Sequence, residues 1–421
     1  MVDEEHDGSY KQQDKLRYHA RDLALVRARE AACPVVLGSA TPSLESLANV
    51  AAGRYVELPL EERAGGASAP AIRLLDIRRR PLIEGLSDRL IDAIGETLSQ
   101  GGQAMVFINR RGFAPTLICN DCGQPADCRR CDAHMTVHAG QSRLRCHHCG
   151  SERPLPPACE HCGSVELDRV GYGTERIAAA LEHAFPDVPM ARIDRDSTRR
   201  KGELDRQLAR AASGEARILV GTQMLAKGHH FPALTLVGIL DADRGLFGTD
   251  FRALEHMAQL VLQVAGRAGR AERPGTVLLQ TRNPDHPLLN LLVRDGYRAL
   301  AEALLEDRRA AELPPASHLA VIRAEAASAS AASAYLAAVR EQLLAIDQGL
   351  DPTRDGECLV LGPAAAPMER LGGRYRAQLL LQASRRAWLH ERLARLVPSM
   401  GELPGARKAR WSIDVDPVDL G

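Results

Sequence analysis

Four C-x-x-C pairs lie within 44 residues of this chain, and they constrain its fold more than any other feature. They are CNDC (119–122), CRRC (128–131), CHHC (146–149) and CEHC (159–162). A C-x-x-C knuckle turns two thiolates toward one tetrahedral ion, and two knuckles complete the four-thiolate shell of a structural zinc site. The sequence therefore predicts an inserted module that holds two structural Zn²⁺ ions, in preference to redox dithiols or iron–sulfur ligands.

The spacing of the knuckles favours one way of grouping them. The two inner pairs have the spacing of a zinc ribbon, which leaves the two outer pairs to form the other site; sequential pairing of neighbouring knuckles stays open. In this grouping, site one consists of Cys119, Cys122, Cys159 and Cys162, and site two of Cys128, Cys131, Cys146 and Cys149. Cys33 and Cys358 stand in apolar segments and are expected to be small buried hydrophobic residues.

The start of the chain, MVDEEHDG, is acidic where a secretory signal would be basic and then apolar. No run of about 18 uncharged apolar residues occurs that could cross a membrane. We therefore expect a cytoplasmic protein without a membrane partner, in which the cysteines bind metal and do not form disulfides.

Apolar segments alternate with helical patterns through the first three-quarters of the chain. Each apolar run is continuous and ends in glycine or polar residues, as strands do in a parallel sheet covered on both faces. The expected strands lie within 33–42, 104–112, 217–223, 234–245 and 275–281, and the expected helices span 174–184, 198–212 and 251–265. This alternation predicts a doubly wound α/β domain with its site at the carboxyl ends of the strands.

The last quarter of the chain has a different pattern. It reads strand, helix, strand, strand, helix, strand, which is the order of a small split βαβ domain. Residues 61–70 (EERAGGASAP) are typical of a linker. We therefore divide the chain into an opening segment (1–60), an α/β domain (68–118 and 163–309), the inserted cysteine module (119–162) and a C-terminal domain (310–421).

Two stretches near the start carry side chains suited to phosphate chemistry. In DEEH, Asp3 would hold Mg²⁺ through water and Glu4 would position the water that attacks the γ-phosphate. In GSATPS, Ser39 and Thr41 follow an apolar run, where their hydroxyls can sense the nucleotide. Taken alone, an acidic run near a terminus is usually a solvated face, and such a turn is common.

Two later stretches complete the pattern. GTQMLAKGHHF follows an apolar strand and places backbone amides and Thr222 at its tip. QLVLQVAGRAGR predicts a helix with Gln263, Arg267 and Arg270, in which residues three apart share a face, so both guanidiniums could reach one phosphate cluster. Such a helix can also be a plain basic surface. The order of all four stretches and their positions at strand ends favour a two-lobed ATPase.

The motifs DEEH, GSATPS, FINRRG, GTQMLAKGHHFPALTLVGILDAD and QVAGRAGR, in this order, resemble the later motifs of DExH-box helicases. The eight-cysteine insertion, and DGSYKQQDKLRYHARDLA directly after DEEH, narrow the resemblance to the PriA family of replication-restart helicases over essentially the whole chain. The resemblance implies a RecA-like second helicase lobe, a truncated first lobe, and an ATP- and Mg²⁺-dependent 3′-to-5′ DNA helicase. Such an enzyme acts at stalled or abandoned forks in the bacterial nucleoid.

The resemblance also implies roles for individual residues. Catalysis would fall to Asp3, Glu4, Arg267 and Arg270. ATP binding and coupling would involve His6, Ser39, Thr41, Gly221, Thr222, Gln223, Gly228 and Gln263. The segment 7–24 corresponds to an aromatic-rich loop whose expected DNA-contacting residues are Tyr10, Lys11, Arg17, Tyr18 and Arg21. Leu16 stands where the family pattern leads us to expect another aromatic residue, and a plain surface hairpin is the alternative reading.

The implied partners are forked and single-stranded DNA, the single-stranded DNA-binding protein and other primosome proteins. Lys+Arg and Asp+Glu both number 54, so a DNA-binding surface must be a local patch. By the same resemblance, the cysteine module would separate strands and dock partners, and the C-terminal domain would be a ribosomal-protein-like fold. The basic residues of that domain are Arg370, Arg374, Arg376, Arg385 and Arg386, which could also be a solvated charged face.

A phosphate-binding loop of the form G-x-x-x-x-G-K-[ST] is absent from residues 1–421. The lysine and hydroxyl that hold the β- and γ-phosphates are therefore not supplied here, and we expect this chain alone to bind ATP weakly and not to hydrolyse it. The alternatives are a non-catalytic zinc-containing module that binds DNA or protein and keeps the motor motifs as relics, and another DExH DNA translocase.

Overall fold

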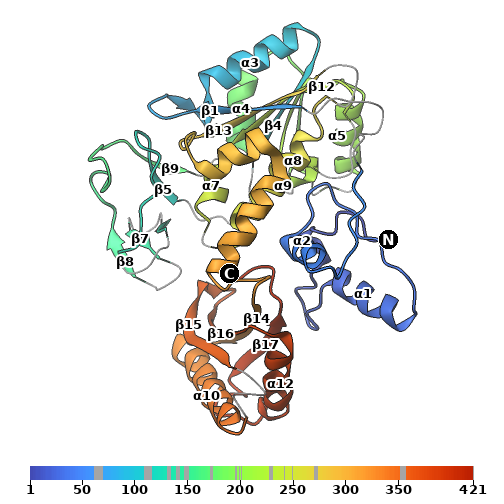
Figure 1. The fold of residues 1–421 in the computed structure, drawn as a ribbon. Coiled ribbons are helices and arrows are strands. Elements are labelled where there is room, and N and C mark those ends of the chain that lie inside the picture. The colour runs from blue at the N-terminus through green and yellow to red at the C-terminus, as the bar shows by residue number, and fades with distance from the viewer. Residues whose placement is uncertain are drawn as a thin grey trace.

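The structure is a computed structural model (Figure 1). It describes residues 1–60, 70–108, 116–129, 134–138, 143–146, 151–170, 174–194, 197–198, 200, 202–226, 231–240, 242–248, 250–269, 274–350 and 357–420. The expected linker at 61–70 lies almost entirely outside these ranges. No helix in the described part of the chain is both long enough and apolar enough to cross a membrane.

A parallel sheet forms the core of the α/β domain, in the upper part of Figure 1. In the described residues it has six strands in the order β1-β13-β12-β4-β11-β10, and every neighbouring pair is parallel. The strands are β1 (Ala71–Asp76), β4 (Gln103–Ile108), β10 (Met190–Ile193), β11 (Ile218–Gly221), β12 (Leu234–Leu240) and β13 (Thr276–Thr281). Four of the five predicted strands lie in this sheet, so the predicted doubly wound class is confirmed.

Helices cover both faces of this sheet because alternate strand residues point to opposite sides. Met105, Phe107 and Leu219 pack with the helices of one face, and Ala104, Val106 and Ile218 with those of the other. The first face carries α5 (Glu203–Ala212), α8 (Ala253–Ala265) and α9 (Pro287–Ala310), and the second carries α3 (Asp88–Ser99) and α4 (Thr174–Ala184). The short helices α6 (Gln223–Ala226) and α7 (Asp243–Leu246) follow β11 and β12, and a small hairpin precedes α3 with β2 (Leu82–Ile83) and β3 (Leu86–Ser87).

The predicted helix over 198–212 begins later than expected. The structure starts α5 at Glu203, directly after Gly202, which has a φ of 81°. This left-handed conformation cannot continue a right-handed helix, so the glycine fixes the start of α5.

The cysteine module projects from the side of the parallel sheet as an antiparallel sheet of its own (Figure 1). Its strand order is β8-β7-β6-β5-β9 in the described residues. The strands are β5 (Thr116–Cys119), β6 (Thr136–His138), β7 (Arg143–Arg145), β8 (Glu152–Pro154) and β9 (Leu167–Val170). Because β5 and β9 pair with each other, the insertion leaves and re-enters the α/β domain side by side.

The C-terminal domain has the predicted order of strands and helices. Its antiparallel sheet runs β15-β16-β14-β17, and α10 and α12 pack on one face. The elements are β14 (His318–Ala326), α10 (Ala329–Gln348), β15 (Cys358–Leu371), β16 (Arg374–Ala383), α12 (Arg386–Leu396), a 3₁₀ turn (Val397–Ser399) and β17 (Ala409–Val415). The long helix α9, which is kinked at Gly296, leads from the parallel sheet to this domain (Figure 1).

The opening segment lies between the α/β domain and the C-terminal domain and contains η1 (Gly8–Tyr10), α1 (Ala20–Glu30) and α2 (Leu44–Ala51). The prediction of a buried strand within 33–42 is wrong. The structure has only an isolated bridge between Val2 and Leu37 there, because no other described strand pairs with either segment. For the same reason Cys33 is exposed, and Cys358 is only partly buried on the edge strand β15, so neither is the fully buried residue that we predicted.

Candidate functional site

The acid box DEEH and the segment GSATPS are bonded directly to each other. The ring nitrogen Nδ1 of His6 lies 2.7 Å from Ser39 Oγ. The carboxylate of Glu5 accepts hydrogen bonds from Ser43, at 2.6 Å from its backbone N–H and at 3.0 Å from its hydroxyl. The backbone N–H of Glu5 donates to the carbonyl of Gly38. The two motifs therefore form one unit, and Glu5, which is 1% exposed, holds it together.

The two predicted catalytic carboxylates remain accessible within this unit. Asp3 is exposed, and the side chain of Glu4 is 41% exposed. Glu4 has a φ of 47°, an uncommon conformation for a residue other than glycine, and its N–H donates to Asp3 Oδ1 at 3.0 Å. Strained backbone of this kind concentrates at functional sites, where the surrounding bonds maintain it.

The GSATPS segment also docks on the helices of the α/β domain. Gln259 of α8 donates to the carbonyl of Thr41 at 3.4 Å, and the hydroxyl of Tyr297 of α9 donates to the carbonyl of Pro42 at 2.7 Å. Gln263 lies one helical turn after Gln259, so it shares that face of α8. The helix that carries the predicted nucleotide-coupling glutamine therefore contacts the predicted sensor segment directly.

Glu255 anchors the same junction from inside the protein. It is 2% exposed, accepts from the backbone N–H of Leu44 at 3.0 Å and pairs with Arg308 at 2.7 Å. Arg252 pairs with Glu45 at 2.6 Å. Burial alone would raise the pKa of Glu45, but the combined attraction of Arg252, Arg21 and Arg308 outweighs burial and lowers that pKa to about 2.

The strand tip after β11 holds the next group of predicted residues. Gly221 ends the strand, and a Cβ at this position would overlap the backbone carbonyl of Ile193, so only glycine fits. Thr222 follows, and Gln223 begins α6. Gly228 lies outside the described residues. Because β11 is parallel to its neighbours, this tip lies at the carboxyl edge of the sheet, as the sequence predicted.

Arg267 follows the end of α8 and is 8% exposed. Its Nε donates to the carbonyl of Ala226 at 3.0 Å, which places the arginine beside the strand tip that follows β11. The other predicted arginine, Arg270, lies outside the described residues. Gln263, Arg267 and Thr222 therefore come from elements that meet at one edge of the sheet.

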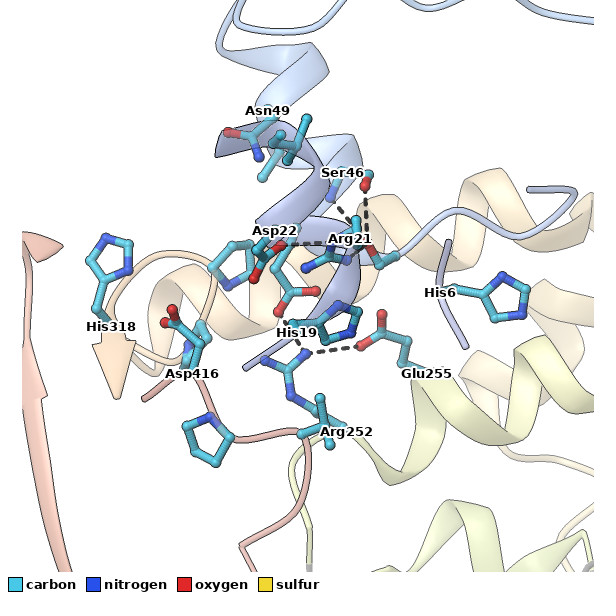
Figure 2. A pocket seen from close by; sticks show the side chains of 18 of the residues that line it. His6, His19, Arg21, Asp22, Ser46, Asn49, Arg252, Glu255, His318 and Asp416 are labelled. Carbon is cyan, nitrogen blue, oxygen red and sulfur yellow. Dashed lines mark hydrogen bonds and ion pairs between the residues drawn. The ribbon is translucent and has the colours of Figure 1, made fainter. Parts of the chain in front are cut away.

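A cleft of about 400 Å³ opens where the opening segment, α8 and the C-terminal domain meet (Figure 2). Arg21 and Asp22 of α1 line one side, and Arg252 lies beside the start of α8. His318 and Asp416 reach the cleft from the C-terminal domain. Three parts of the chain thus shape the cleft, so displacement of any one of them would change it.

His19, on the wall of this cleft, is expected to make the protein less stable in acid. Burial, and then the neighbouring Arg21, lower its pKa to about 4, although Asp22 and Glu45 act in the opposite direction and Lys11 adds to the decrease. A histidine with a lowered folded-state pKa contributes fully above its unfolded pKa of about 6.5, and this stability falls as the pH decreases toward 4. Complete protonation of His19 would lower the free energy of unfolding by about 3 kcal/mol.

The test compares the chain with a His19→Gln variant in urea unfolding at pH 7 and pH 5. Between pH 7 and pH 5, the free energy of unfolding of the wild-type chain should decrease by about 2 kcal/mol more than that of the variant. An equal pH response of the two proteins would contradict the assignment to His19.

The four cysteines of site one converge in the structure. Their sulfur atoms all lie within 4.8 Å of one another, with Cys119 Sγ 3.6 Å from Cys162 Sγ and Cys122 Sγ 3.7 Å from Cys159 Sγ. A tetrahedral zinc site with Zn–S bonds of about 2.3 Å has sulfur–sulfur edges of about 3.8 Å. The geometry therefore fits one four-thiolate ion, and it corresponds to the outer grouping that the spacing favours.

The charge balance of site one also fits a cation. Burial raises the pKa of Cys119 and raises that of Cys122 to about 12, whereas at Cys159 the backbone N–H groups of Cys162 and His161 outweigh burial and lower the pKa. Four clustered thiols cannot all ionise without a positive partner, and a divalent metal supplies one.

Site two is described only in part. Cys128 and Cys146 are buried in the small core of the module, while Cys131 and Cys149 lie outside the described residues.

One knuckle of site one also contacts the α/β domain. Asn283 donates to the carbonyl of Gly123 at 3.2 Å, and Arg282 donates to the side chain of Asn120 at 3.3 Å. Asp243, at the start of α7, accepts from the hydroxyl of Thr281 and from the backbone N–H of Arg282, so it holds this loop in place. The residues around the metal-binding cysteines therefore dock the module.

Substitution of Gly123 by alanine is expected to undock the cysteine module while leaving its zinc content unchanged. Gly123 has a φ of 76°, and a Cβ would overlap the backbone carbonyl of Arg282. Both the left-handed backbone and the close approach favour glycine. The measurement is limited proteolysis at 116–123 together with zinc content. Gly163→Ala is the matched control, since Gly163 has the same φ but no neighbouring atom within 4 Å; equal proteolysis of both variants would contradict a docking role.

The predicted DNA-contacting loop departs from expectation. Lys11 is 4% exposed and pairs with Asp414 of the C-terminal domain at 2.8 Å, and Arg17 pairs with the same carboxylate at 3.6 Å. Arg21 is bound to Glu5 at 3.0 Å. The sequence led us to expect these cations to face DNA phosphates, but buried carboxylates pair with them instead: Asp414 of the C-terminal domain with Lys11 and Arg17, and Glu5 of the acid box with Arg21.

The tip of the loop is the part that faces solvent. Tyr18 is 43% exposed and Leu16 77% exposed, while the hydroxyl of Tyr10 donates to the carbonyl of Asp3 at 2.7 Å. Lys15 is exposed beside Leu16 and was not among the predicted contacts. Lys15 lies between Tyr10 and the expected aromatic position at Leu16, and this placement was the signal in the sequence that could have identified it.

The basic residues of the C-terminal domain are partly neutralised. Arg376 pairs with Glu325 and Arg386 with Asp416, Arg370 and Arg385 stack on Tyr375 and Trp388, and Arg374 is exposed. The sequence assigned no role to four residues that hold the junction together: Glu5, Gln259, Glu255 and Tyr297. Glu5 and Gln259 lie inside the motifs DEEH and QLVLQVAGRAGR, but the side-chain contacts of all four with residues 41–44 span at least 38 residues of sequence, so no local pattern indicated these contacts.

Family models match three parts of the chain. The primosomal protein N C-terminal domain matches residues 309–418, the PriA DNA helicase Cys-rich region domain matches 128–154, and the helicase conserved C-terminal domain matches 173–272. The Cys-rich model includes all four cysteines of site two. The replication restart protein PriA of Haemophilus influenzae is 46% identical over 421 residues, which cover 100% of this chain and 56% of that protein.

The chain belongs to the PriA family. The PriA protein of Bacillus subtilis is 38% identical over 99% of the chain and 51% of its own length. The chain thus spans about half the length of these curated PriA relatives. A solved structure titled "S. cerevisiae Dbp5 bound to RNA and ADP BeF3" is 14% identical with a TM-score of 0.38, covering 72% of this chain and 62% of that one; no inference about function rests on it.

Proposed function

We propose that this chain is the carboxyl-terminal part of an ATP-dependent 3′-to-5′ DNA helicase of the primosome, which recognises stalled or abandoned forks and initiates replisome reloading. The observation that carries the proposal is the junction between the acid box and α8. Ser39 is bonded to His6, and the next residues of the same segment are bonded to Gln259 and Tyr297. A motor needs such a junction, because hydrolysis at one lobe must move the other.

In this proposal ATP with Mg²⁺ binds beside the acid box. Asp3 would hold Mg²⁺, and Glu4 would orient the attacking water. From the second lobe, Thr222, Arg267 and Arg270 contact the phosphates, with Gly221, Gln223, Gly228 and Gln263 shaping the strand tip and its coupling. Arg267 and Arg270 supply positive charge where negative charge develops in the transition state.

The zinc proposal rests on site one, whose four sulfurs lie within 4.8 Å of one another, with two of the sulfur pairs 3.6 and 3.7 Å apart. Cys119, Cys122, Cys159 and Cys162 would hold one Zn²⁺, and the four cysteines of site two a second. Both ions are structural, because four thiolates leave no position for a substrate.

The proposed partners are forked and single-stranded DNA, the single-stranded DNA-binding protein and other primosome proteins in the bacterial nucleoid. Tyr18 is available for base stacking and Lys15 for phosphate contact at the exposed loop tip. Arg374 and Arg385 of the C-terminal domain extend the basic surface.

Binding of fluorescent DNA to this chain tests the proposal. A forked substrate should bind at least about tenfold more tightly than a blunt duplex of the same length, a difference of about 1.4 kcal/mol. Equal affinity for both would contradict fork recognition. Phosphate release measured with the fork present should stay at background, because residues 1–421 contain no G-x-x-x-x-G-K-[ST]. DNA-stimulated turnover by this chain would overturn the expectation that it is inactive alone.

A further inference from the structure

We infer that the carboxylate of Asp414 in the C-terminal domain holds the loop at 7–19 in place, and that Lys11 and Tyr10 connect this contact to the acid box. In this view Lys11 and Tyr10 are positioning residues, not DNA-contacting ones. The consequence for the ATP site rests on the proposed function, but the contact itself does not.

The ammonium group of Lys11 contacts the C-terminal domain at three oxygen atoms. Its Nζ lies 2.7 Å from the carbonyl oxygen of Val415, 3.1 Å from that of Asp416 and 2.8 Å from Asp414 Oδ1. Two of the three N–H donors of the ammonium can therefore reach carbonyl oxygens, while Asp414 Oδ1 lies at ion-pair distance and accepts no hydrogen bond from the described residues. The side chain is 1% exposed, and a DNA phosphate could reach it only after all three contacts had broken.

Asp414 attracts more than one cation of the loop. It is 1% exposed and pairs with Lys11, with Arg17 at 3.6 Å, and with Arg323 of β14 at 3.1 Å. Arg323 also donates to the carbonyl of Asp419, which fixes the end of the chain against the sheet. One buried carboxylate among three cations is the centre of this contact, so its removal should cost more than the removal of a single cation.

A short, rigid turn joins this contact to the acid box. Asp7 accepts from the backbone N–H of Ser9 at 2.8 Å and caps the η1 turn, and Lys11 N–H closes that turn on the carbonyl of Gly8. Within the turn, the hydroxyl of Tyr10 donates to the carbonyl of Asp3 at 2.7 Å. Lys11 is the next residue after Tyr10, so a displacement of β17 moves the turn that supports Asp3.

This arrangement gives the two halves of the loop separate roles. The base of the loop, at Tyr10 and Lys11, connects the C-terminal domain to the carboxylate predicted to hold Mg²⁺. The tip, with Lys15, Leu16 and Tyr18, remains exposed for a ligand. A ligand that shifts either the tip or β17 would therefore change the position of the Asp3 backbone.

Hydrogen–deuterium exchange of the purified chain tests the contact without nucleotide or DNA. Lys11→Met keeps the aliphatic stem and removes the ammonium, and Asp414→Asn removes the central charge. Both should speed exchange of the amides at 7–12 by at least tenfold, while the pairing of β14 with β16 keeps its protection. Asp416→Asn is the matched control, since it keeps the carbonyl that accepts from Lys11 and Asn tolerates the φ of 50° at this position.

Unchanged exchange at 7–12 in Lys11→Met would overturn the inference, and so would an equal increase in Asp416→Asn. If Asp414→Asn unfolds the C-terminal domain, Lys11→Met decides, because Asp414 keeps two other partners in that variant.

Salt-dependent binding of single-stranded DNA provides a second test. Lys11→Met should leave the slope of log affinity against log salt unchanged, whereas a phosphate contact by Lys11 would make the slope shallower by about 0.7. A shallower slope would overturn the positioning role. If the chain binds no DNA while hydrogen–deuterium exchange changes as expected in the variants, the proposed function is contradicted and the inference about Lys11 and Asp414 stands.

Discussion

Removal of zinc is expected to unfold the cysteine module between residues 116 and 170 while the parallel sheet stays folded. The described core of the module is small: it contains Leu117, Met135, Val137 and Leu144, with Cys128 and Cys146 among them. Its strands are three or four residues long, too short to be stable alone. Each structural zinc site supplies an apparent binding free energy of about 10–16 kcal/mol, which dominates the stability of so small a unit.

The native chain should contain about two zinc ions per molecule, and each of Cys159→Ser and Cys128→Ser should lose about one. Cys33→Ser is the matched control, because Cys33 is exposed and remote from the cluster, so it should keep two. Metal content by mass spectrometry and proteolysis after chelation are the measurements. A content near one ion in the native chain would contradict the second site, and intact resistance to protease after chelation would contradict the stabilising role.

Replacement of Glu255 by alanine is expected to destabilise the α/β domain by about 3–5 kcal/mol, since it leaves a buried partner charge without its counterion. That partner is Arg308, which is 4% exposed and bonded to Glu255 at 2.7 Å. The same change removes the acceptor for the backbone N–H of Leu44, so the start of α2 loses its anchor. The loss should therefore extend to the junction between the acid box and α8.

Urea unfolding at pH 7, followed by far-ultraviolet circular dichroism, measures this effect. Trp388 and Trp411 both lie in the C-terminal domain, so their fluorescence reports that domain separately. Glu302→Ala is the matched control: Glu302 pairs with Arg298 at 3.0 Å on an exposed surface, where a pair contributes at most about 1 kcal/mol. A similar decrease in the free energy of unfolding for the two variants would show that Glu255 does not anchor the junction between the acid box and α8.

Much of the architecture followed from short-range patterns. Continuous apolar runs predicted β4, β11, β12 and β13, and the order of elements predicted the C-terminal sheet with α10 and α12 on one face. The expected strand within 33–42 did not form, since an apolar run becomes a strand only beside another strand. The start of α5 at Glu203 depended on one backbone angle, the positive φ of Gly202, which periodicity does not encode.

The residue types of the candidate sites can be recognised in the sequence: the thiols of site one, the acids Asp3 and Glu4, and the arginine after α8. Each is marked by neighbours only a few positions away. Which cations are available to a ligand depends instead on how the chain folds. Lys11 looked like a phosphate contact in its own segment, but its acceptor at Val415 lies 404 residues further along the chain. Ion pairing depends on distance in space and on burial, and a local pattern of residues specifies neither.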